Sequence, residues 1–327
     1  MDIELTRCLQ GAKRDKWTAF LKKAELEPDE QVETTVLIWD EGELIATGSR
    51  QDNLLKCIAV DPLRQGEGLT ATLLTNLRQD AFQAGHTHLF LYTKPKNEFL
   101  FSSLFFYPIA KTQQVLLMEN KQGGIGSFLD SLPAAQSEGV VGAAVMNCNP
   151  FTKGHRYLIE TAAKECDRVY VFVLSEDKSY FSAKDRLEMV KRGTRDLKNV
   201  TVLPTGPYLI SSATFPTYFL KEREKATQIQ CLLDIEIFAK YYAPKFNITR
   251  RYVGTEPLSP MTNQYNQALR AFLPDKGIAL REISRLETDN APISATTVRK
   301  HLHNLTALQT LLPETTLAYL TENDLLK

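Results

Sequence analysis

The chain has 327 residues, 43% of them hydrophobic and 24% charged, with 39 basic residues balanced by 39 acidic ones. This length favours two domains over a single hydrophobic core. The balanced charge argues against a nucleic-acid or membrane-surface partner; no apolar run reaches the roughly 20 residues of a membrane helix, and the N-terminus lacks the apolar core of a secretory signal.

Short strands and helices are predicted in the first part of the chain. A helix over residues 16–24 precedes a strand hairpin that turns at Asp40-Glu41-Gly42. A longer helix over residues 69–83 is stopped by Gly85, the residue type that a helix C-cap prefers. The other elements predicted here are strands at residues 34–39, 44–48, 55–60, 88–93 and 115–119, and an aromatic-rich helix at residues 97–106.

Two glycines precede the predicted helix at residues 69–83, in the sequence DPLRQGEGLT. Gly66 and Gly68 expose consecutive backbone N–H groups ahead of a helix N-terminus, which suits a pyrophosphate, although Gly-rich turns between strands and helices are common. With the order of elements over residues 34–119, the segment resembles the Q/R-x-x-G-x-G/A motif of the GNAT acetyltransferases, whose usual ligand is coenzyme A. The resemblance implies that a CoA-like arm is bound by Gln65, Gly66, Glu67, Gly68, Leu69 and Thr70.

A Gly-, Ser- and Ala-rich segment, residues 121–139, marks the junction between two domains, although part of residues 125–135 is compatible with a short helix. The predicted domains are therefore residues 1–130, an α+β domain, and residues 131–327, both of ordinary size. In the second, apolar strands at residues 140–146, 168–174, 201–203 and 249–253 alternate with helices. This alternation predicts an α/β fold with a Rossmann-like parallel sheet covered on both faces.

The first strand of the second domain leads into a candidate phosphate site, NCNPFTKGHRYLIETAAKE. A helix begins near Gly154, and its first turn presents unpaired N–H groups and the positive end of the helix dipole. Gly154 lets a phosphate approach the backbone, while Thr152 and His155 add hydrogen-bond donors and Lys153 a positive charge. Taken alone, the segment also fits an ordinary strand-to-helix turn in which Thr152 caps the helix.

A second motif lies about 140 residues further along. Here Ile293-Ser294-Ala295-Thr296-Thr297-Val298-Arg299 begins a helix and projects Arg299, whose planar guanidinium can clamp phosphate oxygens. The two segments resemble the T/H-x-G-H and I-S-S-T-x-[IV]-R motifs of the nucleotidylyltransferase superfamily, with Ala295 in place of the usual second serine. The resemblance implies that ATP is held with Mg²⁺ and attacked at its α-phosphate, without a covalent enzyme intermediate.

Two further segments fit the ligand edge of such a sheet. The strand at residues 249–253 ends in Gly254, Thr255 and Glu256, where open α/β sheets bind ligands, and these residues are expected to hold ribose or adenine. Lys178 and Arg186 are placed to reach the β- and γ-phosphates, and Arg186 fits equally well as a partner of a neighbouring glutamate.

The cysteines and histidines predict no further chemistry. Five cysteines are dispersed without a C-x-x-C pair, which indicates reduced thiols in a cytoplasmic protein, and Cys148 is expected to be a packed apolar residue rather than an acyl carrier. Two close histidine pairs, at residues 86/88 and 301/303, lack a nearby cysteine or carboxylate cluster, so no metal site is predicted.

A GNAT-like domain in front of a T-K-G-H domain is an uncommon order. With the stretches SSATFPTYF, RYVGTEP, NQYNQALR and APISATTVRK, it resembles the citrate lyase ligase family over essentially the whole chain. The resemblance implies that acetate and ATP give acetyl-adenylate and pyrophosphate. The acetyl group then passes to the thiol of a dephospho-CoA-type prosthetic group on the acyl carrier subunit of citrate lyase, leaving AMP.

The resemblance also assigns roles to residues. Residues 211–219 are expected to form part of the acetate or carrier surface, or simply a packed loop. Two alternatives stay open: an adenylyltransferase that makes a coenzyme from a phosphorylated precursor, and a non-catalytic CoA- or carrier-binding regulatory module. The implied catalytic residues are His155, Thr152 and Arg299, and the implied ATP-binding residues are Asn149, Phe151, Lys153, Gly154, Lys178, Arg186, Gly254, Thr255, Glu256, Ser294 and Thr296.

Overall fold

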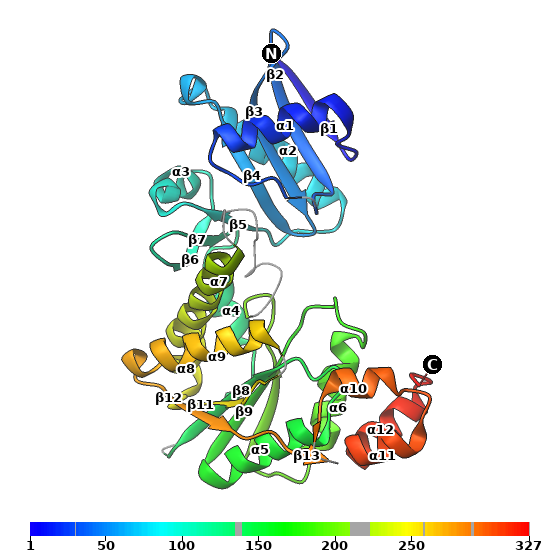
Figure 1. Ribbon diagram of the computed structural model, residues 1–327. Coiled ribbons are helices and arrows are strands. Elements are labelled where there is room, and N and C mark those ends of the chain that lie inside the picture. The colour runs from blue at the N-terminus through cyan, green and yellow to red at the C-terminus, as the bar shows by residue number, and fades with distance from the viewer. Residues whose placement is uncertain (30, 135–138, 210–222, 258, 289–290, 327) are drawn as a thin grey trace. The chain divides into compact units, whose positions relative to one another are not determined.

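The computed structural model describes residues 1–29, 31–134, 139–209, 223–257, 259–288 and 291–326 (Figure 1). These residues fall into two compact units. The first contains residues 1–124, and the second contains residues 125–209 and 234–326. Residues 223–233 are grouped with the first unit, so a single boundary at residue 130 does not separate the two units.

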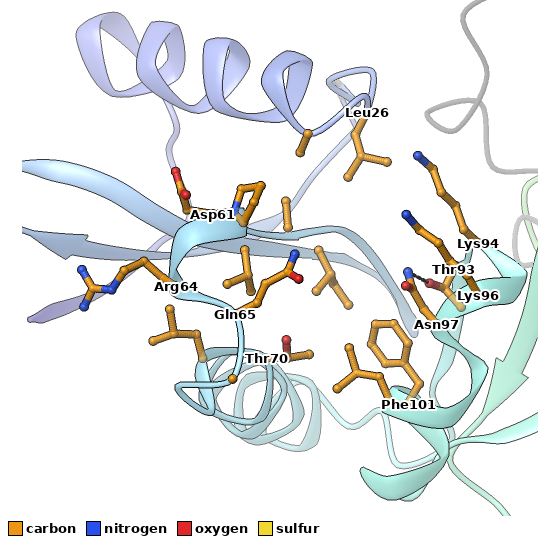
Figure 2. A pocket seen from close by; sticks show the side chains of 18 of the residues that line it. Leu26, Asp61, Arg64, Gln65, Thr70, Thr93, Lys94, Lys96, Asn97 and Phe101 are labelled. Atoms are coloured by element: carbon orange, nitrogen blue, oxygen red, sulfur yellow. Dashed lines mark hydrogen bonds between the residues drawn. The ribbon is translucent and has the colours of Figure 1, made fainter.

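The first unit is built on a seven-stranded sheet in the order β1-β2-β3-β4-β5-β7-β6. Helices α1 and α2 cover its opposite faces (Figures 1 and 2). Leu69, Leu73 and Leu77 form one buried stripe of α2, and Gly85 follows the helix with φ +85°, as predicted for its C-cap. The elements are β1 (Asp2–Thr6), α1 (Gly11–Lys23), β2 (Thr34–Asp40), β3 (Glu43–Gln51), β4 (Leu54–Val60), η1 (Pro62–Arg64), α2 (Leu69–Gln83), β5 (Phe90–Thr93), η2 (Pro95–Asn97), α3 (Glu98–Ser103), β6 (Tyr107–Lys111) and β7 (Leu116–Glu119).

Strands β4 and β5 are parallel neighbours that soon diverge. They share two residue pairs, Leu54 with Phe90 and Leu55 with Leu91. Beyond them β4 carries an irregularity in its pairing with β3, where Cys57 adopts φ +53°. A bulge of this kind bends a strand, so the backbone of β4 leaves β5 before either strand ends.

The second unit is built on a wholly parallel five-stranded sheet in the order β10-β9-β8-β11-β12, which confirms the predicted α/β fold. Its strands are β8 (Val141–Met146), β9 (Arg168–Val173), β10 (Val200–Pro204), β11 (Arg250–Gly254) and β12 (Ala279–Ile283), with a separate hairpin of β13 (Glu287–Thr288) and β14 (Ala291–Pro292). Its helices are α4 (Gly124–Asp130), α5 (Lys153–Glu165), α6 (Ala183–Gly193), α7 (Arg223–Ile237, entering from the first unit), η4 (Phe238–Tyr242), α8 (Ala243–Phe246), α9 (Pro260–Phe272), η5 (Pro274–Lys276), α10 (Ala295–Lys300), α11 (Leu305–Leu311) and α12 (Glu314–Glu322).

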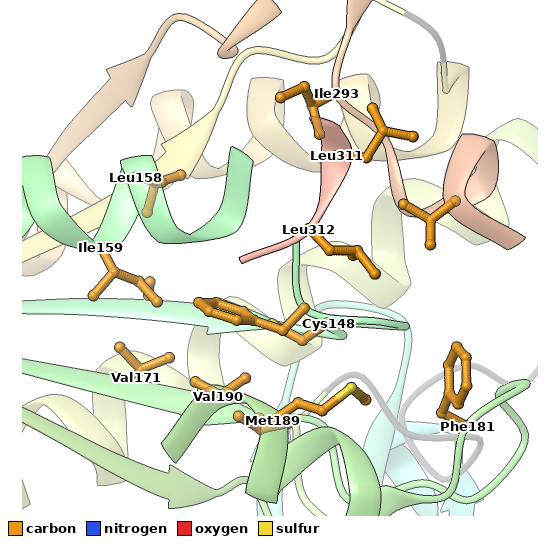
Figure 3. Close-up of a cluster of buried hydrophobic side chains, with 14 of the residues drawn as sticks. Cys148, Leu158, Ile159, Val171, Phe181, Met189, Val190, Ile293, Leu311 and Leu312 are labelled. Carbon is orange, nitrogen blue, oxygen red and sulfur yellow. The ribbon is translucent and has the colours of Figure 1, made fainter. Parts of the chain in front are cut away.

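Alternate residues of β9 supply both faces of this sheet. Val169, Val171 and Val173 join a buried cluster with helices α5, α6, α11 and α12 (Figure 3). Tyr170 and Phe172 point to the other face and pack on Phe246 of α8, with ring centroids 4.7 and 5.4 Å apart. Burial on both faces explains the continuous apolar run that predicted the strand.

Five strands were absent from the sequence prediction: β1, β6, β12 and the two short strands of the β13–β14 hairpin. Each lies at an edge of its sheet. In β1 and β12 exposed and partly buried residues alternate without a fully buried position. An edge strand needs no continuous apolar run, and the missed strand β12 places residues 284–286 at the carboxyl edge of the second sheet.

Candidate functional site

The second unit contains a cavity of about 780 Å³ at the carboxyl ends of β8 and β11. The order of strands reverses between these two strands, because β9 and β10 lie on one side of β8 while β11 and β12 lie on the other. Open α/β sheets bind their ligands at such a point. Strands β8 and β11 share the pairs Arg250 with Gly142 and Arg251 with Ala143, and the cavity lies beyond them.

Thr152 and His155 form a reciprocal cap at the N-terminus of α5. The His155 N–H donates to Thr152 Oγ1 at 3.3 Å, and the Thr152 N–H donates to His155 Nδ1 at 3.0 Å. Because Nδ1 accepts a hydrogen bond, the proton of the neutral imidazole resides on Nε2. His155 therefore offers an N–H donor, at the cavity wall and beside the positive end of a 13-residue helix.

The charge state of His155 follows from its surroundings. Burial, and then the positive charge of Arg285, lowers the pKa of His155 to about 4. The imidazole is thus neutral at pH 7, and it acts as a hydrogen-bond donor without adding a charge. Gly154 precedes it, and a Cβ at this position would lie 3.4 Å from the Ile293 carbonyl, so the helix start approaches the second motif closely.

The second motif is joined to the first by Arg299. Its Nη1 donates to the carbonyl of Asn149, and its Nη2 donates to Thr296 Oγ1 at 3.1 Å. Ser294 caps α10 by accepting from the Thr297 N–H at 3.0 Å. The predicted residues Thr152, His155 and Arg299, from both ends of the second domain, therefore line one cavity.

Nine of the predicted second-domain residues line the cavity: Asn149, Thr152, Gly154, His155, Gly254, Glu256, Ser294, Thr296 and Arg299. Thr255 follows Gly254 but does not line it. Its N–H donates to Ile283 at 2.9 Å, and its carbonyl accepts from Arg285 Nε at 2.7 Å. Thr255 thus helps to place Arg285.

Arg186 lies outside the cavity and is fully buried. Its guanidinium donates to the backbone carbonyls of Phe181, Asn147, Leu174 and Glu176. These carbonyls already engage the donors that the sequence led us to expect at a phosphate or a neighbouring glutamate. Arg186 instead fixes the loop that follows β9.

The other three predicted residues also lie away from the cavity. Phe151 is buried, and a Cβ on Gly193 would meet its ring at 2.4 Å, so this ring is a core element. Lys153 donates to the Gln309 carbonyl at 2.8 Å and lines a separate cavity of about 430 Å³. Lys178 pairs with Glu176 at 3.5 Å.

Several cavity residues were missed from the sequence: Arg251, Ser259, Thr262, Tyr265, Asn266, Arg285 and Lys300. Arg285 pairs with Glu256, the one acidic residue among the described lining residues. Four cationic side chains line the cavity: Arg251, Arg285, Arg299 and Lys300. Their excess over one carboxylate makes the cavity suited to a polyanion.

Cys148 belongs to the core beneath this cavity. Its side chain lies among Ile159, Val171 and Met189 in the buried cluster (Figure 3). Burial raises the pKa of the Cys148 thiol well above its usual range. Because the thiolate is the nucleophilic form, Cys148 is unsuited to carry an acyl group, in agreement with the packing role predicted for it.

The first unit contains a second cavity, of about 870 Å³, where β4 and β5 diverge. Gln65, Gly66, Gly68, Leu69 and Thr70 line it, as expected for a CoA-like ligand. Gly66 and Gly68 adopt φ +93° and +76°, which L side chains rarely adopt. Figure 2 shows Gln65 and Thr70 on one side of the cavity and Lys94, Lys96 and Asn97 on the other.

The rim of the first cavity is cationic. Lys94 is bonded to Glu25 at 3.1 Å, whereas Lys96 is exposed and forms no ion pair in the described part of the chain. Glu67, expected to contact the ligand, does not line the cavity; it binds Arg64 Nε at 2.7 Å, and Arg64 points away from the other side chains in Figure 2.

The described residues contain no group of three or more histidine, cysteine or acidic side chains placed to hold a metal ion. Their helices include none with the length and apolar character to cross a membrane. Residues 211–219, expected at the acetate or carrier surface, lie outside the described residues.

Comparisons with known proteins agree with this geometry. Residues 141–320 match the model of the citrate lyase ligase C-terminal domain, and residues 4–100 match that of the acetyltransferase (GNAT) family. The chain is 40% identical to a citrate (pro-3S)-lyase ligase of Klebsiella pneumoniae over 316 residues, which cover 94% of this chain and 92% of that protein.

Two further relatives extend the comparison. A citrate (pro-3S)-lyase ligase of Escherichia coli is 41% identical over 92% of this chain and 88% of its own length. A phosphopantetheine adenylyltransferase of Clostridium botulinum is 37% identical over 117 residues, 35% of this chain and 67% of that protein.

Proposed function

The chain belongs to the citrate lyase ligase family of enzymes, and from this membership we propose that it activates acetate with ATP for transfer to citrate lyase. In the first step a carboxylate oxygen of acetate attacks the α-phosphorus of ATP. A new P–O bond forms, the bond to the β-phosphate oxygen breaks, and pyrophosphate leaves with the bonding electrons. The product is acetyl-adenylate.

The observation that carries this proposal is the joined motif pair in the second cavity. Thr152 and His155 stand at the N-terminus of α5, and Arg299 reaches the Asn149 carbonyl beside them. We assign to these residues the stabilisation of negative charge on the α-phosphate during attack. Fixed donors at a helix N-terminus act strongly where water is excluded and need no reorganisation during the reaction.

ATP is proposed to bind in the second cavity as its Mg²⁺ complex. Glu256 is the one acidic residue among the described lining residues, and its carboxylate is engaged by Arg285. This donor set fits an ion that is held by phosphate oxygens and water rather than by a protein cage, as is usual for Mg²⁺ with nucleotides. The ion would neutralise charge on the departing pyrophosphate.

In the second step the thiol of the carrier's prosthetic group receives the acetyl group. The sulfur attacks the acyl carbon, a C–S bond forms, the C–O bond to AMP breaks, and the thiol proton is lost to solvent. We propose that residues 1–130 bind the dephospho-CoA-type arm and that residues 131–327 perform adenylation. The Gly66–Gly68 loop and Lys96 at the first cavity support this role, because both suit phosphate groups.

The enzyme is also proposed to act in the cytoplasm. No disulfide joins the five cysteines, all of which lie in the described part of the chain, and four of them are buried. Reduced, unpaired cysteines are typical of proteins in a reducing compartment.

The test is ATP–pyrophosphate exchange with and without acetate. We expect exchange that depends on acetate and requires no carrier, and a loss of roughly 10²- to 10³-fold in the His155→Asn variant, the usual effect of removing one charge-stabilising donor. Exchange that needs a phosphorylated coenzyme precursor instead would favour an adenylyltransferase. ATP binding without any exchange would favour a regulatory module.

A further inference from the structure

Arg251 is a buried cation at the wall of the second cavity. Its side chain is 2% exposed, and it extends from β11. Nε and Nη1 are both inaccessible to solvent and have no hydrogen-bond partner. Nor does Arg251 form an ion pair with any residue that the structure describes.

The other arginines of this region are satisfied. Arg186 donates to backbone carbonyls, and Arg285 pairs with Glu256. An arginine buried without partners is costly, because desolvation of a charge is repaid only by ion pairing and hydrogen bonds. A ligand that supplies negative charge and an acceptor atom would offset this cost.

The placement of Arg251 separates it from the phosphate-binding end of α5. Its neighbour Tyr252 points to the α5 face, where its hydroxyl meets Glu165 at 2.9 Å and the Cys166 sulfur at 3.2 Å. Since successive residues of a strand point to opposite faces, Arg251 lies on the other face. There its guanidinium carbon stands 4.4 Å from the ring centroid of Phe238.

Phe238 covers one flat side of the guanidinium, which leaves the N–H groups at its edge for a ligand in the same plane. Asp234, whose negative charge favours the charged form of Arg251, does not occupy them. Asp234 is buried, and its carboxylate accepts from the Tyr265 hydroxyl at 2.5 Å, without coming within ion-pair distance of Arg251. A carboxylate oxygen is a charged acceptor that such N–H groups bind strongly, and a carboxylate has a second oxygen that stays available for reaction.

We propose that Arg251 binds the carboxylate of the small acid that this enzyme activates, an inference that rests on the proposed function. The phosphates of ATP have their own donors in Thr152, His155 and Arg299. One oxygen of the acid engages the guanidinium, and the other attacks the α-phosphorus. Once the acyl-phosphate bond has formed, the acid's negative charge is gone, and Arg251 releases the acyl group for transfer.

The test compares Arg251→Met with Arg250→Met in the acetate-dependent ATP–pyrophosphate exchange. Arg250 is the adjacent residue of β11; it is partly exposed, binds the Glu165 carbonyl at 3.1 Å and does not line the cavity. We expect the KM for acetate to rise at least about tenfold in Arg251→Met, since hydrogen bonds to charged groups are among the strongest. The KM for ATP should stay within about twofold in both variants.

Thermal stability gives a second readout, independent of turnover. Because Arg251 is unsatisfied without ligand, Arg251→Met should melt at the wild-type temperature or above it. Acetate should raise the melting temperature of the wild type and of Arg250→Met but not of Arg251→Met. If Arg251→Met fails to fold, Arg251→Lys, which keeps the charge without the planar fork, should show the raised KM.

Three results would overturn the inference: an unchanged KM for acetate in the Arg251 variants, a raised KM for ATP in place of that for acetate, or acetate protection that survives in Arg251→Met. Failure of the proposed function looks different. In that case the wild type itself would catalyse no carboxylate-dependent exchange, while the melting experiment would still report whether Arg251 holds an acid.

Discussion

At the scale of single residues, two side chains of the second cavity are each held through one atom by a hydrogen bond within the protein. Their remaining donors are therefore directed to the cavity. Thr152 engages Nδ1 of His155, which leaves the Nε2 proton for the cavity. The Asn149 carbonyl engages one nitrogen of Arg299, and this fixes the plane of the guanidinium. Such second contacts restrict rotation, so little ordering remains to be done when the ligand binds.

The protonation of His155 is directly measurable. We expect its imidazole to titrate with a pKa of about 4, and this pKa to rise in Arg285→Gln because one nearby positive charge is removed. It should stay below the ordinary value of about 6.5, since burial is the larger cause. The measurement is the pH dependence of the imidazole Cε1–H resonance by NMR.

Arg281→Gln is the matched control, because Arg281 lies on the preceding strand and pairs with Glu165 outside the cavity. Equal midpoints in all three proteins would contradict the assignment to Arg285. The lowered pKa also makes stability depend on pH. Because His155 has a lower pKa in the folded protein than in the unfolded chain, the unfolded chain binds more protons between pH 6.5 and pH 4. The His155 contribution to the free energy of unfolding is therefore present at pH 7 and is lost as the pH falls through that window.

Some residues of this cavity were predictable and others were not. Thr152, His155 and Arg299 belong to segments whose spacing and neighbours indicate a helix start at a ligand edge. Arg285 was missed because it follows β12, an edge strand whose charged residues break the apolar pattern. Arg251 began a segment that was expected to hold ribose or adenine, but it was not singled out, since only the structure reveals that two of its nitrogens are buried without a hydrogen-bond partner.

At the scale of elements, the two cavities share one construction. In each unit two parallel strands are joined by two residue pairs and then diverge, β4 from β5 and β8 from β11. Each cavity opens where this pairing ends, and residues at the N-terminus of a helix, α2 or α5, line it. Backbone groups released from a sheet remain hydrogen-bonding groups, so the gap between the strands is a natural site for a polar ligand.

Arg186 illustrates how an element can mislead sequence analysis. Its position near the sheet edge suggested phosphate binding, yet it secures the loop between β9 and α6. We expect Arg186→Leu to lower the free energy of unfolding by about 3 kcal/mol or more, because several buried carbonyls lose their donor. The measurement is urea unfolding followed by circular dichroism.

Arg192→Leu, on the same helix, is the control for Arg186→Leu. Arg192 forms surface pairs with Glu188 and Glu322, which contribute about 1 kcal/mol or less. The structural role of Arg186 would be contradicted if the two variants were equally stable and only Arg186→Leu lost affinity for ATP. That result would support phosphate binding by Arg186.

At the scale of the whole molecule, the division of labour is testable by separating the two half-reactions. Gly66→Asp places a negative charge at the wall of the first cavity, and we expect it to raise the KM for the acyl carrier at least about tenfold by repelling the arm's phosphates. Acetate-dependent exchange, which uses the second cavity, should be unchanged. The assays are carrier acetylation and pyrophosphate exchange on the same preparation.

Gly85→Asp is matched to it in charge and in backbone strain. Both glycines have positive φ, +93° and +85°, and a Cβ at either meets nothing within 4 Å, but Gly85 does not line the cavity. Aspartate tolerates this conformation better than most residues. A similar KM for the carrier in both variants, or loss of exchange in Gly66→Asp, would argue against the proposed division.

The order of the two units was predictable, because each carries its own glycine-containing strand-to-helix turn and a compositional change separates them. The grouping of residues 223–233 with the first unit was not, since it is a tertiary property of a helix that crosses from one unit to the other. A boundary drawn on the sequence assumes that each unit is continuous, and that assumption fails here.

The Arg299–Asn149 bond spans 150 residues and has a consequence for the order in which a growing chain acquires its sites. The residues that line the first cavity are complete once Leu104 has been synthesised, whereas the second cavity waits for Lys300. Domains generally fold as units, N-terminal first, as the chain leaves the ribosome. A nascent chain halted between these points would carry every residue that lines the first cavity and would lack Arg299, so the proposed adenylation site is the last of the two to be completed.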